Sequence, residues 1–195
     1  MTIQRFDQYS SREEAVFNRF LDDYANQPDW EEVKEHLSNY VMHPDETEDY
    51  DIGCPTEHGY IRFDIQISEN FKRYGDLRID YVSIFQPPSF WTRSLEDFES
   101  AVADGRVIVE KWGKVVDPKA DFLLVEFHNG NPLRRVYNLA QLHQSLEELR
   151  DVGQFRTNRK FGESWGSAFL AVPESHQILQ RTSPKTLADL LKQAK

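Results

Sequence analysis

A hairpin pattern over residues 49–68 is the feature that most limits how this chain can fold. Apolar and polar residues alternate over residues 60–68, and this period of two is typical of a strand with one buried face. His58 and Gly59 come just before that strand and favour a tight turn. We therefore expect residues 49–56 to form an antiparallel partner strand.

The polar face of this hairpin gathers side chains that could carry chemistry. Asp64 and Gln66 are two residues apart and point to the same side of the strand. The antiparallel partner would carry Asp51 back beside them, so two carboxylates and an amide would share one face. An ordinary hairpin with a solvated polar face explains the same pattern, and both interpretations stay open.

Composition indicates a folded but acidic protein. The 195 residues suffice for one domain with a core, and an aromatic content of 13% compensates for a modest aliphatic content. There are 33 acidic and 23 basic residues, which gives a net charge of -10. This charge argues against a protein that coats DNA through a uniformly basic surface. Any DNA binding would need a local basic groove or bound cations.

Cysteine usage and hydropathy indicate the compartment. Cys54 is the only cysteine, so the chain has no intramolecular disulfide and no cysteine-based zinc site. The N-terminal residues lack the apolar core of a signal peptide, and no apolar run reaches the length of a membrane span. We expect a soluble, cytoplasmic protein without a membrane partner.

The remaining patterns predict one α/β or α+β domain over residues 1–195. We expect N-terminal helices within residues 11–42, a central mixed sheet within about residues 49–172 and a C-terminal helix over 184–194. The first helix would open at a capping box of Ser11 and Glu14, and the second would end near Met42. Further strands are expected at residues 76–85, 122–127, 133–137 and 167–172, and a strand or a hairpin around Gly113 is expected at 106–116. Further helices are expected at 94–105 and 138–153.

The spacing of Asp51, Asp64 and Gln66 resembles the restriction-endonuclease-like, or PD-(D/E)XK, nuclease superfamily. The pattern of that family is D…(D/E)-x-K on two adjacent strands, and the resemblance covers about residues 31–68. It implies a restriction-endonuclease-like fold and a Mg²⁺-dependent (or Mn²⁺-dependent) deoxyribonuclease. Asp51 and Asp64 would hold the metal ion, which would activate water for hydrolysis of a phosphodiester.

Gln66 departs from the family pattern, because the family usually has Lys there. A Gln amide can orient the attacking water but supplies no positive charge. The resemblance also implies a Glu from the preceding helix. Glu31, Glu32 and Glu35 are the candidates, and the sequence does not choose between them.

A basic segment over residues 154–161 could contact nucleic acid. It contains no acidic residue and places Arg156, Arg159 and Lys160 among aromatic residues, an arrangement that suits phosphate contact and base stacking. A surface loop whose cations offset nearby acids explains it equally well. We expect DNA as the partner and leave a homodimer open.

Two alternatives compete with the hairpin site. Asp76, Arg78 and Asp80 share one face of a strand, and Glu126 with His128 could ligate a metal, although charges near strand ends are usually just solvated. A different class of function is also open. The net charge and the missing Lys favour a non-catalytic acidic module for protein interaction or regulation on the same fold.

Overall fold

The chain contains two compact units. The computed structural model describes residues 3–24, 31, 34, 37–42, 50–69, 75–128, 132–158, 164–183, 185–187 and 189. The first unit comprises Met1–Glu69, Lys119–Asn138 and Arg181–Lys195, and the second comprises Asn70–Pro118 and Leu139–Gln180. The expectation of one domain stays a prediction, whereas the mixed α/β character is confirmed.

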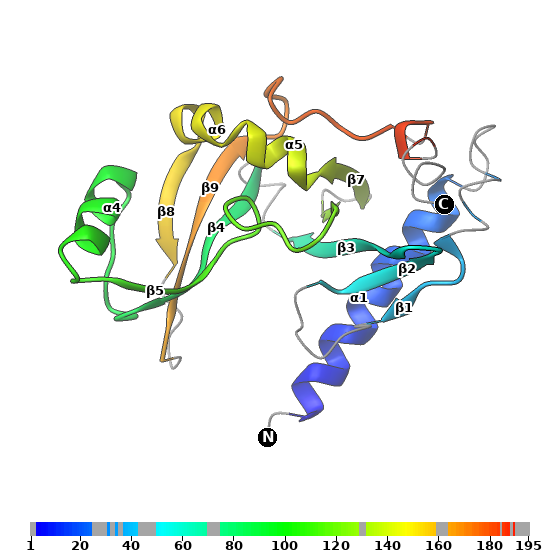
Figure 1. Cartoon of the computed structure of the whole chain (residues 1–195), viewed down its shortest axis with the longest axis horizontal. Coiled ribbons are helices and arrows are strands. Elements are labelled where there is room, and N and C mark those ends of the chain that lie inside the picture. Colours follow the sequence, from blue (N-terminus) through cyan, green and yellow to red (C-terminus); the bar gives the residue numbers. More distant parts are fainter. Residues whose placement is uncertain are drawn as a thin grey trace. The chain divides into compact units, whose positions relative to one another are not determined.

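The first unit is built on a mixed five-stranded sheet in the order β1-β2-β3-β6-β7 (Figure 1). Its strands are β1 (Val41–Met42), β2 (Ile52–Thr56), β3 (Gly59–Ser68), β6 (Phe122–Phe127) and β7 (Leu133–Asn138). Strands β3 and β6 are parallel, and all other neighbours in the sheet are antiparallel. The sheet is therefore assembled from an N-terminal hairpin and a second hairpin that comes much later in the chain.

Strands β2 and β3 form the hairpin that the sequence predicts. Thr56 pairs with Gly59, so Glu57 and His58 make a two-residue turn. Gly59 has a φ of 136°, a conformation that residues with a side chain rarely adopt. The partner strand begins at Ile52, three residues later than expected.

Helix α1 (Ile3–Tyr24) buries its apolar stripe against one face of this sheet (Figure 1). The ring centroids of Phe17 and Phe63 are 5.3 Å apart in an edge-on arrangement, and Phe63 stacks on Phe122 at 5.3 Å. These rings join the helix, β3 and β6 in one core. The other face of β3, with Asp64 and Gln66, points away from α1.

The N-terminal helix predictions are wrong at their boundaries. Helix α1 begins at Ile3, so Ser11 lies inside the helix and does not cap it. The helix continues from Ile3 to Ser11 because no Gly or Pro interrupts it there. Residues 31, 34 and 37 are helical, but the second helix cannot reach Met42. Val41 and Met42 instead pair with β2, because sheet pairing overrides a helical apolar pattern.

The second unit contains an antiparallel four-stranded sheet in the order β5-β4-β9-β8, with helices packed on it. The strands are β4 (Asp76–Gln86), β5 (Ile108–Trp112), β8 (Gln154–Asn158) and β9 (Gly166–Pro173), and the helices are α4 (Leu95–Ala103), α5 (Leu139–Gln144) and α6 (Leu146–Val152). Aromatic rings fill its core, and Phe98 lies 5.4 Å from Phe85 and 5.2 Å from Phe155 between ring centroids.

Local signals in the second unit are largely confirmed. Ser94 caps α4, since its hydroxyl oxygen accepts the N–H of Asp97 at 3.1 Å. The helix expected over 138–153 is divided into α5 and α6 at Ser145. The start of the basic segment is the strand β8 and not a loop.

Two further expectations concern the ends of the chain and the membrane. Residues 185–187 and 189 are helical, as expected for a C-terminal helix, whose other residues lie outside the described part. Among the residues that the structure describes, no helix combines the length and the apolar character needed to cross a membrane.

The burial of Cys54 on β2 gives a test of the hairpin. Burial raises the pKa of this thiol to about 12, and the side chain is 1% exposed. We expect iodoacetamide to label Cys54 at least about 100-fold more slowly in the native protein than in urea, because the core must open first. A Ser100→Cys variant, with its new thiol on the exposed side of α4, should be labelled rapidly at that position. Equal native and denatured rates at Cys54 would contradict the fold of the hairpin.

Candidate functional site

The β2–β3 hairpin places Asp51 beside the strand segment that contains Asp64. The N–H of Asp51 donates to the carbonyl oxygen of Phe63 at 3.0 Å. Oδ2 of Asp51 accepts the N–H of Ile65 at 2.6 Å. Because Asp51 binds the residues on both sides of Asp64, the two acidic residues lie at the same level of the sheet. Their roles as metal ligands stay predictions.

Asp64 and Gln66 lie on the face of β3 opposite to α1. Asp64 is 7% exposed and Gln66 is half-buried. Their partners in the parallel strand β6 are Leu123 and Val125, which are both fully buried. Apolar neighbours lower the local dielectric, so a charge at Asp64 interacts more strongly with a nearby cation than it would in water.

Arg62 adds a fixed positive charge to the same face, two residues before Asp64. Asp121 accepts the N–H of Arg62 at 2.8 Å and binds its guanidinium through Nε at 3.3 Å and Nη2 at 3.1 Å. The guanidinium also lies 5.8 Å from the centroid of the Tyr50 ring, and Tyr50 immediately precedes Asp51. Asp121 and the Tyr50 ring thus hold the guanidinium of Arg62 on the face of β3 that carries Asp64.

Sequence reasoning missed this arginine, although a signal was present. The alternation over residues 60–68 already puts Arg62 on the face of Asp64 and Gln66. Its partner Asp121 is 59 residues away in sequence, so no local pattern could connect the two.

The metal site expected from the resemblance would have few protein ligands. Among the described residues, no three His, Cys, Asp or Glu side chains form a group that could hold a metal ion. Mg²⁺ commonly takes one or two carboxylates and completes its shell with water and substrate phosphate oxygens. Asp51 and Asp64 would match that smaller number of carboxylates if both bound the ion. Of the helical candidates, Glu31 is exposed, and Glu32 and Glu35 lie outside the described residues.

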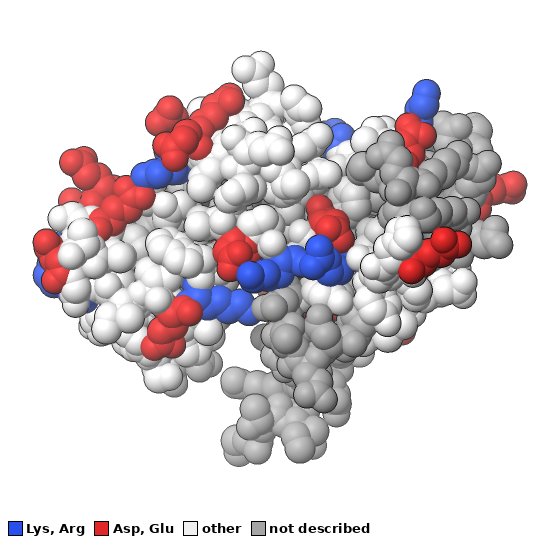
Figure 2. Space-filling view, in the orientation of Figure 1, with Lys and Arg blue, Asp and Glu red and all other residues white. Residues whose placement is uncertain are grey.

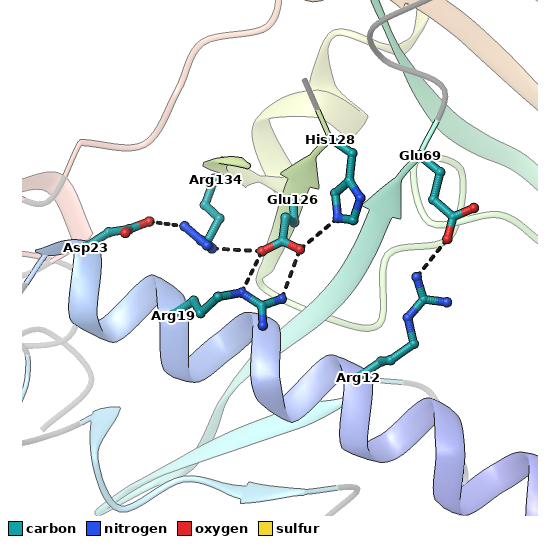
Figure 3. A network of polar contacts seen from close by, with 7 residues as sticks. All are labelled: Arg12, Arg19, Asp23, Glu69, Glu126, His128 and Arg134. Carbon is teal, nitrogen blue, oxygen red and sulfur yellow. Dashed lines mark hydrogen bonds and ion pairs between the residues drawn. The ribbon is translucent and has the colours of Figure 1, made fainter. Parts of the chain in front are cut away.

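A second cluster surrounds the buried carboxylate of Glu126 on β6 (Figure 3). Arg19 of α1 binds both oxygens, with Nε at 3.0 Å and Nη2 at 2.9 Å. Arg134 of β7 donates from Nε at 2.9 Å, and His128 contacts the carboxylate through Nε2 at 2.9 Å. Arg134 also forms an ion pair with Asp23 of α1, so the cluster connects the helix with β6 and β7.

This geometry makes Glu126 a structural residue. Each of its oxygens accepts two hydrogen bonds, and two guanidinium groups beside it would repel a metal cation. The alternative that Glu126 and His128 ligate a metal is therefore not supported. The expectation of a merely solvated charge is also wrong, because the Glu126 side chain is 3% exposed.

The protonation of Glu126 follows from opposing effects. Burial by itself would raise the pKa of Glu126. Hydrogen bonds from Arg19 and His128 and the charges of Arg19 and Arg134 outweigh burial, so this pKa is lowered. The carboxylate is ionised and can only accept hydrogen bonds, so Nε2 of His128 carries the proton that it donates.

A further ion pair joins Arg12 of α1 to Glu69, which follows β3, at 2.7 Å. Both side chains are exposed.

The predicted nucleic-acid residues belong to the second unit. Arg156 lies on β8 and donates from Nη2 to Oε1 of Gln154 at 2.8 Å. Phe155 is buried in the core, so it cannot stack on a base. Arg159 and Lys160 lie outside the described residues.

Charges elsewhere are consistent with the acidic composition. On the face shown in Figure 2, acidic side chains lie among the basic ones. The alternative centre on β4 contains an ion pair between Asp76 and Arg78 at 3.6 Å, and Asp80 is half-buried on the same strand.

The Glu126 cluster should contribute strongly to stability. A Glu126→Gln substitution leaves Arg19 and the buried Arg134 without their carboxylate, and we expect a loss of about 3 kcal/mol in the free energy of unfolding, measured in urea. The matched control is Glu147→Gln, which breaks an exposed ion pair with Arg150 and should cost less than about 1 kcal/mol. Equal losses in the two variants would contradict a structural role for the cluster.

The same cluster should make stability depend on pH. Because the pKa of Glu126 in the folded protein is below its ordinary value of 4.5, its contribution is complete above pH 4.5. That contribution should disappear as the pH falls further, through the lower pKa of the folded state. We expect the difference in unfolding free energy between the wild type and Glu126→Gln to be constant from pH 7 to 5 and to shrink below that range. A difference that grows with acidification would overturn this interpretation.

Comparisons of this chain with models of protein families, with curated proteins and with solved structures give no match. No family is therefore assigned, and the restriction-endonuclease-like relationship stays a prediction.

Proposed function

We propose that the chain is a Mg²⁺-dependent deoxyribonuclease whose metal ligands are Asp51 and Asp64. The observation that carries the proposal is the pair of hydrogen bonds by which Asp51 flanks Asp64 on the β2–β3 hairpin. Two acidic positions that are distant in sequence thus meet at one level of the sheet. A restriction-endonuclease-like fold belongs to this proposal, and the hairpin beside the parallel pair of β3 and β6 supports it.

Each residue of the site has a distinct role in this proposal. When bound, Mg²⁺ would activate a water molecule and stabilise charge on the scissile phosphate. Asp51 and Asp64 would supply carboxylate oxygens to the ion. The amide of Gln66 would orient the attacking water, which requires no charge.

Arg62 would supply the positive charge that Gln66 lacks. It shares the polar face of β3 with Asp64 and Gln66, and Asp121 and Tyr50 fix its position. A guanidinium presents five N–H donors in a planar fork that suits phosphate oxygens, and Nε and Nη2 of Arg62 bind Asp121. Arg62 precedes Asp64 by two residues, whereas the Lys of the family would follow Asp64 by two residues. The positive charge would therefore act from the other side of Asp64.

A second candidate function is a non-catalytic module for protein interaction or regulation. Two observations favour it: the neutral Gln66, and the use of one Asp51 oxygen to bind the backbone of Ile65. The net charge of -10 would suit a basic protein partner. Absence of divalent-metal binding, together with capture of a basic protein, would distinguish this candidate.

Isosteric variants test the nuclease proposal. We expect the wild type to cleave DNA with Mg²⁺ or Mn²⁺, and Asp51→Asn and Asp64→Asn to lose both cleavage and Mn²⁺ binding measured by calorimetry. The Asn at position 51 keeps an oxygen for the N–H of Ile65, so the hairpin should survive. Arg62→Gln should retain metal binding but lower the cleavage rate about 100-fold, as for loss of one donor aimed at developing charge.

The matched control is Asp104→Asn, which removes an exposed carboxylate that pairs with Arg106. Its activity and metal binding should equal those of the wild type. Cleavage by Asp64→Asn at the wild-type rate would refute the proposal, and so would a wild type that binds no divalent metal.

A further inference from the structure

A short segment around Thr92 is bound to the edge strand β8. The N–H of Thr92 donates to Oγ1 of Thr157 at 3.0 Å, and the carbonyl oxygen of Thr92 accepts the N–H and the hydroxyl of Thr157, both at 3.2 Å. Both threonines are buried. The hydroxyl of Thr92 also accepts the N–H of Ser94 at 3.0 Å, next to the start of α4. The segment is therefore anchored on both sides.

This anchoring displays two neighbouring side chains on the surface. Trp91 is 52% exposed, and Arg93 is exposed as well, while Thr92 between them is buried. The guanidinium carbon of Arg93 lies 5.4 Å from the centroid of the Trp91 ring. The arginine covers one part of the ring and orients it, and more than half of the tryptophan surface stays accessible.

Strand β8 carries a third cationic side chain, Arg156, one residue before Thr157, to which Thr92 is bound. Phe155 and Thr157 point into the core, so Arg156 between them points to the other side of the sheet. Its neighbour in β9 is Phe169, and Arg78 of β4 lies 5.2 Å from the centroid of the Phe169 ring. Arg156, Phe169 and Arg78 thus lie near one another on adjacent strands, where Asp80 of β4 is the other neighbour of Phe169 and Asp76 pairs with Arg78.

The charges of Arg93 and Arg156 are notable in so acidic a chain. None of the ion pairs among the described residues involves either arginine, and the side-chain partner of Arg156 is the neutral Gln154. Asp97 accepts a long hydrogen bond from the hydroxyl of Thr92 at 3.4 Å. Cations without carboxylate partners beside an exposed ring match the chemistry of a phosphate backbone with bases.

We propose that Trp91, Arg93 and Arg156 form a binding surface for single-stranded nucleic acid. A base would stack on the accessible part of Trp91, and the two arginines would contact phosphates. A duplex hides its base faces, so stacking selects a single strand. The inference rests on the proposed function only in taking nucleic acid as the ligand, and it needs neither a metal ion nor any residue of the hairpin.

Fluorescence anisotropy with the full chain, EDTA and a labelled oligo-dT of about 12 nucleotides tests this surface. We expect Trp91→Ala, Arg93→Gln and Arg156→Gln each to weaken binding about 10-fold. Binding of a duplex of the same length should be weaker than binding of the single strand. The controls Trp112→Ala and Arg106→Gln remove an exposed ring and an exposed cation elsewhere in the same unit and should bind like the wild type.

Salt dependence separates the two kinds of contact. Each arginine variant should reduce the slope of log affinity against log salt by about 0.7, whereas Trp91→Ala should leave the slope unchanged. Wild-type affinity in the three variants, equal losses in the controls or a preference for duplex would each overturn the inference. The Asp64→Asn variant should bind the oligonucleotide normally, so failure of the nuclease proposal leaves this test intact.

Discussion

The buried carboxylate of Glu126 is the interaction on which the first unit depends. Glu126 of β6 receives hydrogen bonds from Arg19 of α1, from His128 after β6 and from Arg134 of β7. The helix and both strands therefore meet at one charge. A buried charge is costly unless it is paired and fully hydrogen-bonded, and here both oxygens are occupied. The cluster fixes helix α1 along the sheet, and α1 in turn covers the apolar face of the β2–β3 hairpin.

Carboxylates in the first unit have two different electrostatic situations. Glu126 is surrounded by guanidinium groups, so its charge is already compensated and is used for structure. Asp51 and Asp64 meet on the hairpin beside apolar residues of β6, with one arginine held nearby by Asp121. Under the proposal made above, a divalent cation would bind at the hairpin and not at Glu126, because the two guanidinium groups beside Glu126 would repel it.

Local patterns in the sequence predict much of the fold, and distant partners explain what they miss. The hairpin, strands β4, β6 and β9, and the cap at Ser94 follow from alternation, apolar runs and turn residues. The pairing of Val41 in β1 depends on a strand that a helical pattern does not contain. Nothing in the structure explains the break at Ser145. The candidate site was found in part: Asp51, Asp64 and Gln66 are evident from spacing. The contact of Arg62 with Asp121 was missed because the two residues are 59 positions apart. The contact of Glu126 with Arg19 was missed because those two residues are 107 positions apart.

The order of segments in the first unit has a consequence for biosynthesis. Strand β3 needs β6 as its parallel neighbour, and the chain between them, Asn70–Pro118, belongs to the other unit. While a ribosome is translating that intervening segment, one edge of β3 has no neighbour to pair with, and its row of amides and carbonyls is open to other chains. Nascent chains of this protein should therefore be most prone to aggregate before residue 127 emerges, and least prone once β6 has docked.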